Sequence, residues 1–313
     1  MTDTTVIGDV NVDLLSSPIS SYPKKDLQIL IPSINLQVGG GANNFAFAIS
    51  KLGLKTRLIG LVGNDIFAEY IIKKLNEFKI ENKIRKTGRE RTGVSLGIQF
   101  VDGSRSLITF RGTNSILSLK DFRLKDIEGK ALHISGYNFL DELRRDFYGI
   151  VRYAKKKRMI VSLEPDIKSG IRFRIEDFRK ILNFVDIFLP DIKEGKMLTD
   201  KKAGKRKKSN EEIMKSLLNF GCKIVALKCG EKGCVVGNKN EIFTIKGIKV
   251  RPVNSTGVGD IFNAAFVFKY LETADIKESG IFANATAALA ATKADEKRFV
   301  TKKQVTNFLK RYG

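Results

Sequence analysis

The stretch that decides the fold is Asn254-Ser255-Thr256-Gly257-Val258-Gly259-Asp260, which runs directly into the apolar helical segment 261–271. Glycines let backbone amides approach a ligand closely, and the first amides of a helix have no partner within it, so this junction predicts an anion-binding site. The carboxylate of Asp260 would be favoured there by the helix dipole alone. For an isolated Gly-x-Gly-Asp, a purely structural role of the aspartate would therefore be the better interpretation. Other parts of the sequence are needed to indicate whether this junction binds a ligand.

The two common nucleotide-binding motifs are absent. A dinucleotide fingerprint needs a third glycine where position 262 is Phe, and the first strand is not followed by Gly-x-Gly. No Gly-Lys pair continues into Ser or Thr, as a P-loop requires. The predicted anion site is therefore neither a dinucleotide-binding fingerprint nor a P-loop.

Composition describes a folded globular protein: 313 residues with 42% hydrophobic side chains. No apolar run approaches the roughly 18 residues needed to span a bilayer, so we expect a cytoplasmic protein without membrane contact. A single histidine, His133, excludes a Ser-His-Asp triad and multi-histidine metal sites and is interpreted as structural. The cysteines Cys222, Cys229 and Cys234 are expected to be reduced thiols.

The net charge of +22 raises the possibility of a polyanionic partner. Two basic runs stand out, 155–158 and 201–208, and the second is expected to be a solvated loop. Neither contains interleaved aromatic residues for base stacking, so we expect no specific nucleic-acid partner. Solubility, attraction of anionic substrates or a lysine-rich high-temperature composition explains the charge better.

Short β-branched runs alternate with segments of helical period, which is typical of a mostly parallel sheet covered by helices. The expected strands are 5–7, 57–62, 159–163, 185–189 and 223–228, and the segment 233–236 turns back. The expected helices are 44–52, 67–78, 211–219, 258–271 and 280–292.

Two insertions interrupt this alternation. Segment 92–110 reads as a hairpin around the turn Asp102-Gly103-Ser104. Segment 14–36 is extended and carries prolines at 18, 23 and 32. Together they predict a small sheet that would act as a lid.

Two long motifs at opposite ends of the chain carry a resemblance to a known family. One is Gly39-Gly40-Gly41-Ala42-Asn43-Asn44-Phe45-Ala46, with Gly53 and Gly63 beyond it, and the other is 254–260. Further similarity lies at 8–13 and 284–288. The chain resembles the ribokinase-like (PfkB) carbohydrate kinases over nearly its whole length.

That resemblance implies an α/β fold with a doubly wound, mostly parallel central sheet, helices on both faces and a small β-sheet lid. The α/β domain would comprise 1–13, 37–91 and 112–313, and the lid 14–36 and 92–111. It implies ATP- and Mg²⁺-dependent phosphorylation of a hydroxyl of a sugar or sugar derivative, in a homodimer formed through the lid.

Site residues follow from the same resemblance. Asp260 would be the general base, and the amides of Gly257, Val258, Gly259 and Asp260 would form an anion hole. The acceptor-side residues would be Asn11, Asp13, Gly39, Gly40 and Asn44. Apart from the resemblance, Arg105 and Arg111 of the predicted lid would suit an anionic acceptor. The nucleotide-side residues would be Asp191, Lys228, Gly230, Gly233 and Asn284. Glu194 would hold the metal indirectly, through water.

Three departures from the family pattern qualify this transfer. Asp191 stands where the family usually has Asn, which adds a negative charge near the metal. Asn254 replaces an aspartate, which places a family-type monovalent-cation site in doubt, and Val258 replaces a small residue. A nucleoside kinase of the same family is the alternative; a non-catalytic ligand-binding relative and a nucleic-acid-binding protein are weaker ones.

Overall fold

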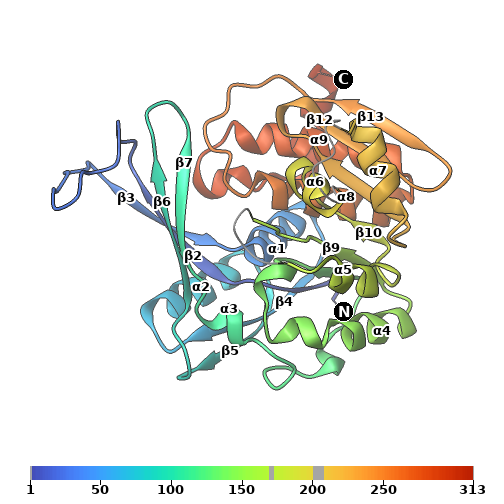
Figure 1. Cartoon of the computed structure of the whole chain (residues 1–313), viewed down its shortest axis with the longest axis horizontal. Coiled ribbons are helices and arrows are strands. Elements are labelled where there is room, and N and C mark those ends of the chain that lie inside the picture. Colours follow the sequence, from blue (N-terminus) through green and yellow to red (C-terminus); the bar gives the residue numbers. More distant parts are fainter. Residues whose placement is uncertain (1, 169–172, 200–207, 313) are drawn as a thin grey trace.

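The computed structural model describes residues 2–168, 173–199 and 208–312, which form a nine-stranded sheet flanked by helices and a separate four-stranded sheet (Figure 1). The expectation of a solvated basic loop at 201–208 lies outside the described residues, except for Lys208. No described helix is long and apolar enough to cross a membrane.

The central sheet has the strand order β13-β12-β11-β10-β9-β8-β1-β4-β5. Its strands are β1 (Thr4–Ile7), β4 (Thr56–Gly63), β5 (Glu81–Thr87), β8 (Ala131–Ile134), β9 (Ile160–Leu163), β10 (Ile187–Phe188), β11 (Ile224–Lys228), β12 (Gly233–Gly237) and β13 (Ile242–Lys246). All neighbours from β5 to β11 are parallel, whereas β12 and β13 are antiparallel additions at one edge. The predicted mostly parallel sheet is confirmed.

Helices cover both faces of this sheet, because successive strand residues point to opposite sides. Val6 of β1 belongs to one apolar core and its neighbour Ile7 to the other. The first core is covered by α1 (Gly41–Leu52), α2 (Ile66–Glu77), α8 (Val258–Thr273), α9 (Ile276–Ala291) and α10 (Lys302–Tyr312). The second is covered by α3 (Thr113–Ile116), α4 (Phe147–Lys156), α5 (Ile175–Leu182), α6 (Ile192–Thr199) and α7 (Asn210–Leu218). The doubly wound prediction is confirmed.

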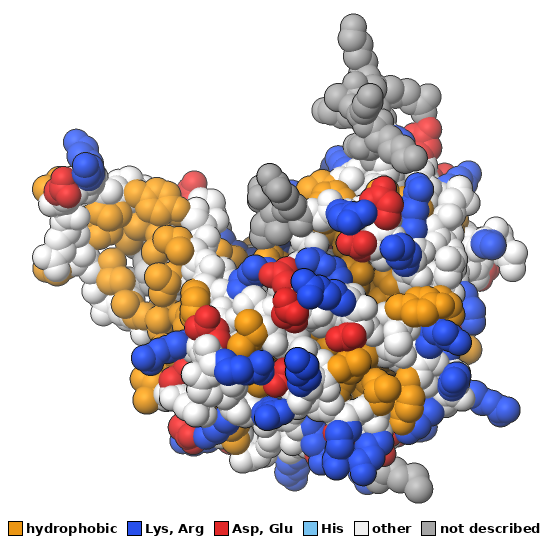
Figure 2. Space-filling model, turned by 60° about the horizontal axis from the view of Figure 1, so that its bottom comes forward, with side chains coloured by type: hydrophobic (Ala, Val, Ile, Leu, Met, Phe, Trp, Pro, Cys, Tyr) orange, Lys and Arg blue, Asp and Glu red, His pale blue; other side chains and the backbone are white. Residues whose placement is uncertain are grey.

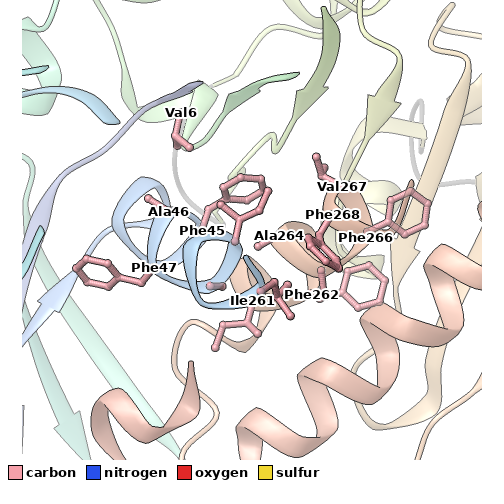
Figure 3. Packing of buried hydrophobic residues seen from close by; sticks show 14 of the residues in the cluster. Val6, Phe45, Ala46, Phe47, Ile261, Phe262, Ala264, Phe266, Val267 and Phe268 are labelled. Carbon is pink, nitrogen blue, oxygen red and sulfur yellow. The ribbon is translucent and has the colours of Figure 1, made fainter. Parts of the chain in front are cut away.

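Helix α8 is central to the first core. Every residue from Ile261 to Phe268 is buried, as expected for a helix that is apolar on all sides. Figure 3 shows Ala264 of α8 next to Phe45 of α1, and both residues belong to the first core. Burial of each large apolar side chain contributes about 1.5–3 kcal/mol, so this packing holds the N-terminus of α8 firmly against α1.

The small sheet has the order β3-β2-β6-β7 and projects from one side of the body (Figure 1). Its strands are β2 (Asn11–Ser16), β3 (Ile34–Gly39), β6 (Gly93–Gln99) and β7 (Arg105–Phe110). The β6–β7 pair is the expected hairpin, and Gly103 has the positive φ of 82° that its turn requires. Asn11 pairs with both Gly39 and Gly93, so β2 and β6 begin, and β3 ends, at the same edge of this sheet.

His133 lies in the core. It is fully buried, stacks on Phe45 with ring centroids 3.6 Å apart, and its Nδ1 is 2.9 Å from the Ser162 hydroxyl. Burial lowers the pKa of His133 to about 3, so the imidazole stays neutral and structural.

Candidate active site

The junction quoted at the outset forms a glycine-lined helix start. Gly257 has φ 70°, in the left-handed region that favours glycine, and a Cβ there would lie 2.8 Å from Asn44 Nδ2. The first helical bond of α8 runs from the Ile261 amide to the Gly257 carbonyl. The amides of residues 258–260 precede that bond and are therefore available to an anion.

Asp260 lies in the first turn of α8 and contacts the other end of the sequence. Its Oδ2 accepts a hydrogen bond of 2.8 Å from Asn44 Nδ2 in α1. Burial, followed by the nearby charge of Glu164, raises the pKa of Asp260 well above the usual value, although Asn44 and Lys228 oppose the rise. This carboxylate is consequently a stronger base than an exposed aspartate.

A buried ion pair lies beneath the helix start. Lys228 Nζ donates to Glu164 Oε1 at 2.9 Å and to Asn263 Oδ1 at 3.0 Å, and Asn263 Nδ2 donates to the same Glu164 oxygen at 2.8 Å. Burial alone would raise the pKa of Glu164, but Lys228 outweighs it and holds that pKa at about 2. Lys228 Nζ is also 3.8 Å from the position of a Cβ on Gly259, so a cation lies directly below the amides.

Three of the predicted acceptor-side residues, Asn11, Asp13 and Gly39, lie on β2 and β3 of the small sheet. A Cβ on Gly39 would be 2.0 Å from Asp13 Oδ1, so only glycine leaves room for that carboxylate. Asn11 Oδ1 accepts a hydrogen bond of 2.5 Å from Asn114 Nδ2. Burial raises the pKa of Asp13 to about 6, against the opposing charges of Arg298 and Arg105.

Gly40 caps α1 with φ 87°, and a Cβ there would be 2.5 Å from the Asp9 carbonyl oxygen. Its absent side chain allows α1 to start next to the end of β1, which is what brings Asn44 to Asp260.

Two arginines join this group. Arg298, only 2% exposed, donates from Nη2 to Asn44 Oδ1 at 3.0 Å and from Nη1 to the Thr256 carbonyl at 2.9 Å. Arg105 of β7 donates to the Thr256 hydroxyl. Sequence reasoning missed Arg298, Glu164 and Asn263 and gave Arg105 only a conditional role. Two of these residues could have been found from their positions in the sequence. Asn263 lies one helical turn after Asp260, and Glu164 directly follows β9.

Asp191 and Glu194 form the start of α6. Asp191 Oδ1 accepts from the Glu194 amide at 2.8 Å, and Glu194 Oε2 accepts from the Asp191 amide at 2.7 Å. Glu194 Oε1 accepts from the Ile167 amide at 2.9 Å. Both Glu194 oxygens are thus bonded to backbone, and burial raises the pKa of this carboxyl to about 8 although Lys228 opposes it. No group of three or more His, Cys, Asp or Glu suited to a metal occurs in the part of the chain that the structure describes.

The remaining predicted site residues are Gly230, Gly233, Asn284 and Arg111. Gly233 has φ 96° and turns the chain into β12, while Gly230 has φ 62° with open space beside it. Asn284 Nδ2 donates to the Lys246 carbonyl at 2.8 Å. Arg111 pairs with Asp141 at 2.6 Å, and no hydrogen bond or ion pair joins its guanidinium to the described acceptor-side side chains.

A doubly wound α/β body, a small sheet at its edge and an aspartate at a glycine-lined helix start are the features expected of a phosphotransferase with an alcohol acceptor. Comparison with family models agrees: the pfkB family carbohydrate kinase model matches residues 1–301. The chain belongs to this family.

Relatives and solved structures support the same assignment. The chain is 28% identical over 313 residues to a ribokinase from Haemophilus influenzae, covering 96% of each chain. It is 27% identical over 270 residues to a probable fructokinase-5 of Arabidopsis thaliana, covering 81% of this chain and 82% of that protein.

Among solved structures, ribokinase from Thermotoga maritima matches with a TM-score of 0.83 and 25% identity, over 99% of this chain and 100% of that one. A candidate ribokinase II from E. coli, solved with ATP and Mg²⁺, matches with a TM-score of 0.84 and 22% identity over 100% of both chains. The second match concerns the fold alone.

Proposed function

We propose that this protein transfers the terminal phosphoryl group of ATP, with Mg²⁺, to a hydroxyl of a sugar or sugar derivative. The observation that carries the proposal is the Asn44–Asp260 hydrogen bond of 2.8 Å, because it joins the carboxylate in the first turn of α8 to α1, the helix that directly follows β3. The ATP- and Mg²⁺-bound structural neighbour supports the choice of donor and metal.

In this mechanism Asp260 Oδ accepts the proton of the attacking hydroxyl, and the amides of 258–260 bind the oxygens of the moving phosphoryl group. Lys228 adds positive charge from below those amides. When bound, ATP supplies the phosphoryl group and Mg²⁺ neutralises charge on its phosphate oxygens. Asp13 orients the acceptor through hydrogen bonds to its hydroxyls.

The residues present fit ATP and Mg²⁺. The left-handed Gly257 and the side-chain-free Gly259 leave the amides open to a phosphate. Glu194, whose oxygens are held by the amides of Ile167 and Asp191, would act on the metal through water and not as a direct ligand. Lys228, Gly230, Gly233 and Asn284 are proposed to form the nucleotide side.

Asp260→Asn tests the assignment of the base. We expect turnover, measured by coupled ADP release, to fall by roughly 10²–10⁴-fold while ATP affinity is kept. Asp275→Asn is the matched control, since Asp275 also sits at a helix start, accepting from the Glu278 amide at 2.8 Å, but lies at α9. Turnover of Asp260→Asn close to that of the control would exclude Asp260 as the base.

Asp13→Ala tests the assignment of Asp13 to the acceptor and not to ATP. We expect KM for the acceptor to rise while KM for ATP is unchanged, because Asp13 is proposed to contact only the acceptor. Turnover of the wild-type protein is measured on a set of sugars and nucleosides, which also separates the sugar-kinase proposal from the nucleoside alternative. A variant with weakened ATP binding and an unchanged KM for the acceptor would assign Asp13 to the nucleotide and not to the acceptor.

We also propose that the small sheet acts as a lid and pairs with that of a second copy. Its region carries exposed apolar side chains, among them Leu30 at 89%, Leu107 at 51% and Ile108 at 61%. Figure 2 shows hydrophobic side chains gathered on a face of the projecting sheet. Such a patch is typical of an interface. Leu107→Asp is expected to convert a dimer into a monomer in light scattering, whereas a wild-type monomer would refute the dimer.

A further inference from the structure

Two arginines reach the same threonine from different parts of the fold. Arg298, in the turn Asp295–Arg298, binds the Thr256 carbonyl, and Arg105, from the small sheet, binds the Thr256 hydroxyl. Both guanidinium groups interact electrostatically with Asp13 and with Asp260. The two positive charges therefore border the space between the acceptor-side carboxylate and the proposed base.

Neither arginine is neutralised by direct contact. Within the described ranges, no carboxylate lies within ion-pair distance of Arg105 or Arg298, and Arg298 Nε is buried without a hydrogen-bond partner. A buried charge without a partner is costly, and native structures normally pair it. Arg298 is in this state, whereas Arg105 is exposed, so Arg105 is the guanidinium that an incoming anion can reach.

Other cations near the site are already committed. Arg111 pairs with Asp141, whose second oxygen accepts from Arg144 at 3.1 Å. Lys228 pairs with Glu164 below the helix start, where it serves the moving phosphoryl group together with the amides. Arg105 and Arg298 are thus additional to the charges that phosphoryl transfer uses, and Arg105 is drawn first to Asp13, on the acceptor side.

We propose that the acceptor carries an anionic group, a phosphate or a carboxylate, which binds Arg105 while Arg298 fixes Thr256 and adds charge behind it. This inference builds on the proposed kinase function and narrows its substrate class to sugar phosphates or sugar acids. Arg105 would be the contacting residue and Arg298 a positioning residue that also holds the Asn44 amide toward Asp260.

Binding is measured by calorimetry on the wild-type protein without ATP, so that no turnover interferes. Ligands are matched pairs: ribose with ribose 5-phosphate, fructose with fructose 6-phosphate, and glucose with gluconate. We expect at least one anionic member to bind more tightly than its neutral partner. Adding Arg105→Ala should weaken that anionic ligand by about 10–100-fold, the range for hydrogen bonds to charged groups, and leave neutral sugars unaffected.

Lys25→Ala is the control, because Lys25 is an exposed cation in the β2–β3 connection. Arg298→Lys keeps the charge and is expected to retain more of the anion preference than Arg298→Ala, with circular dichroism reporting whether each variant folds. Arg105 is on an exposed strand, so Arg105→Ala should fold. It therefore tests the anion-binding role even if Arg298→Ala does not fold.

Three results would overturn the inference: equal affinities within every pair, no binding by any anionic member, or anion binding that survives Arg105→Ala. In the otherwise wild-type enzyme, an Arg105→Ala variant that lowers kcat equally for neutral and anionic acceptors would assign the arginines to the moving phosphoryl group instead. If the wild-type protein phosphorylated no acceptor while selective binding persisted, the proposed function would fail and the anion subsite would stand.

Discussion

Lys228→Met tests the buried pair on which the site is built. The lysine and Glu164 are 2.9 Å apart, and both side chains are 11% exposed, so solvent screens their attraction little. The fold lowers the pKa of Glu164 from 4.5 to about 2. Removing one partner of a buried ion pair typically costs roughly 3–5 kcal/mol, because the other charge is left buried and uncompensated, so we expect Lys228→Met to lower the free energy of unfolding by about that amount.

The pH dependence gives the sign of the effect. In the wild type, the contribution of Glu164 is complete above its unfolded pKa of 4.5 and is lost as the pH falls toward about 2. Without Lys228, burial raises the pKa of Glu164, so its ionisation destabilises the fold at neutral pH and protonation relieves that cost in acid. The difference in stability between the two proteins should therefore be largest near neutrality and shrink below about pH 5.

Urea unfolding, followed by circular dichroism across that pH range, measures both effects. Lys228→Met combined with Glu164→Gln should recover much of the loss, because no uncompensated charge remains. Lys86→Met is the exposed control, since Lys86 pairs with Glu69 on the surface and this pair should contribute less than about 1 kcal/mol. A single Lys228 variant as stable as wild type at neutral pH would refute the reasoning.

Three further predictions concern the same region. Gly257→Ala should cost about 1–3 kcal/mol in urea unfolding and lower ADP release, because φ is 70° and the new Cβ would be 2.8 Å from Asn44; full stability would show that the turn relaxes. Burial, with Asp166 and Glu164 adding to it, raises the pKa of Asp9 from 3.8 to about 7, so its ionisation destabilises the fold as pH rises through that range. Asp9→Asn should thus be more stable than wild type in thermal melts above neutrality and equal to it in acid, and a constant difference at all pH values would contradict this. Asn44→Ala removes a bond that lowers the pKa of Asp260, so the acid limb of the kcat/KM–pH profile should move to higher pH; an unmoved limb would separate Asn44 from the base.

Much of the fold could be predicted because its signals are local. The glycines before α8, the apolar residues 261–268 and the β-branched strands each act over a few neighbouring positions, so their periodicity is readable in the chain. The motif at 39–46 and the motif at 254–260 also identified the family, and the structure places Asn44 and Asp260 in contact. The lid boundaries and the individual roles of site residues stay predictions.

The sequence alone thus determined the family, the layered sheet and the aspartate at a glycine-lined helix start, because each follows from residues close together in the chain. Only the tertiary structure decided which charges surround that aspartate. Arg298 bonds to Asn44 across 254 positions and Arg105 to Thr256 across 151, and in the sequence both look like ordinary basic residues. Strand order and helix packing bring them together, and burial then changes their energies, so neither effect can be read from local pattern.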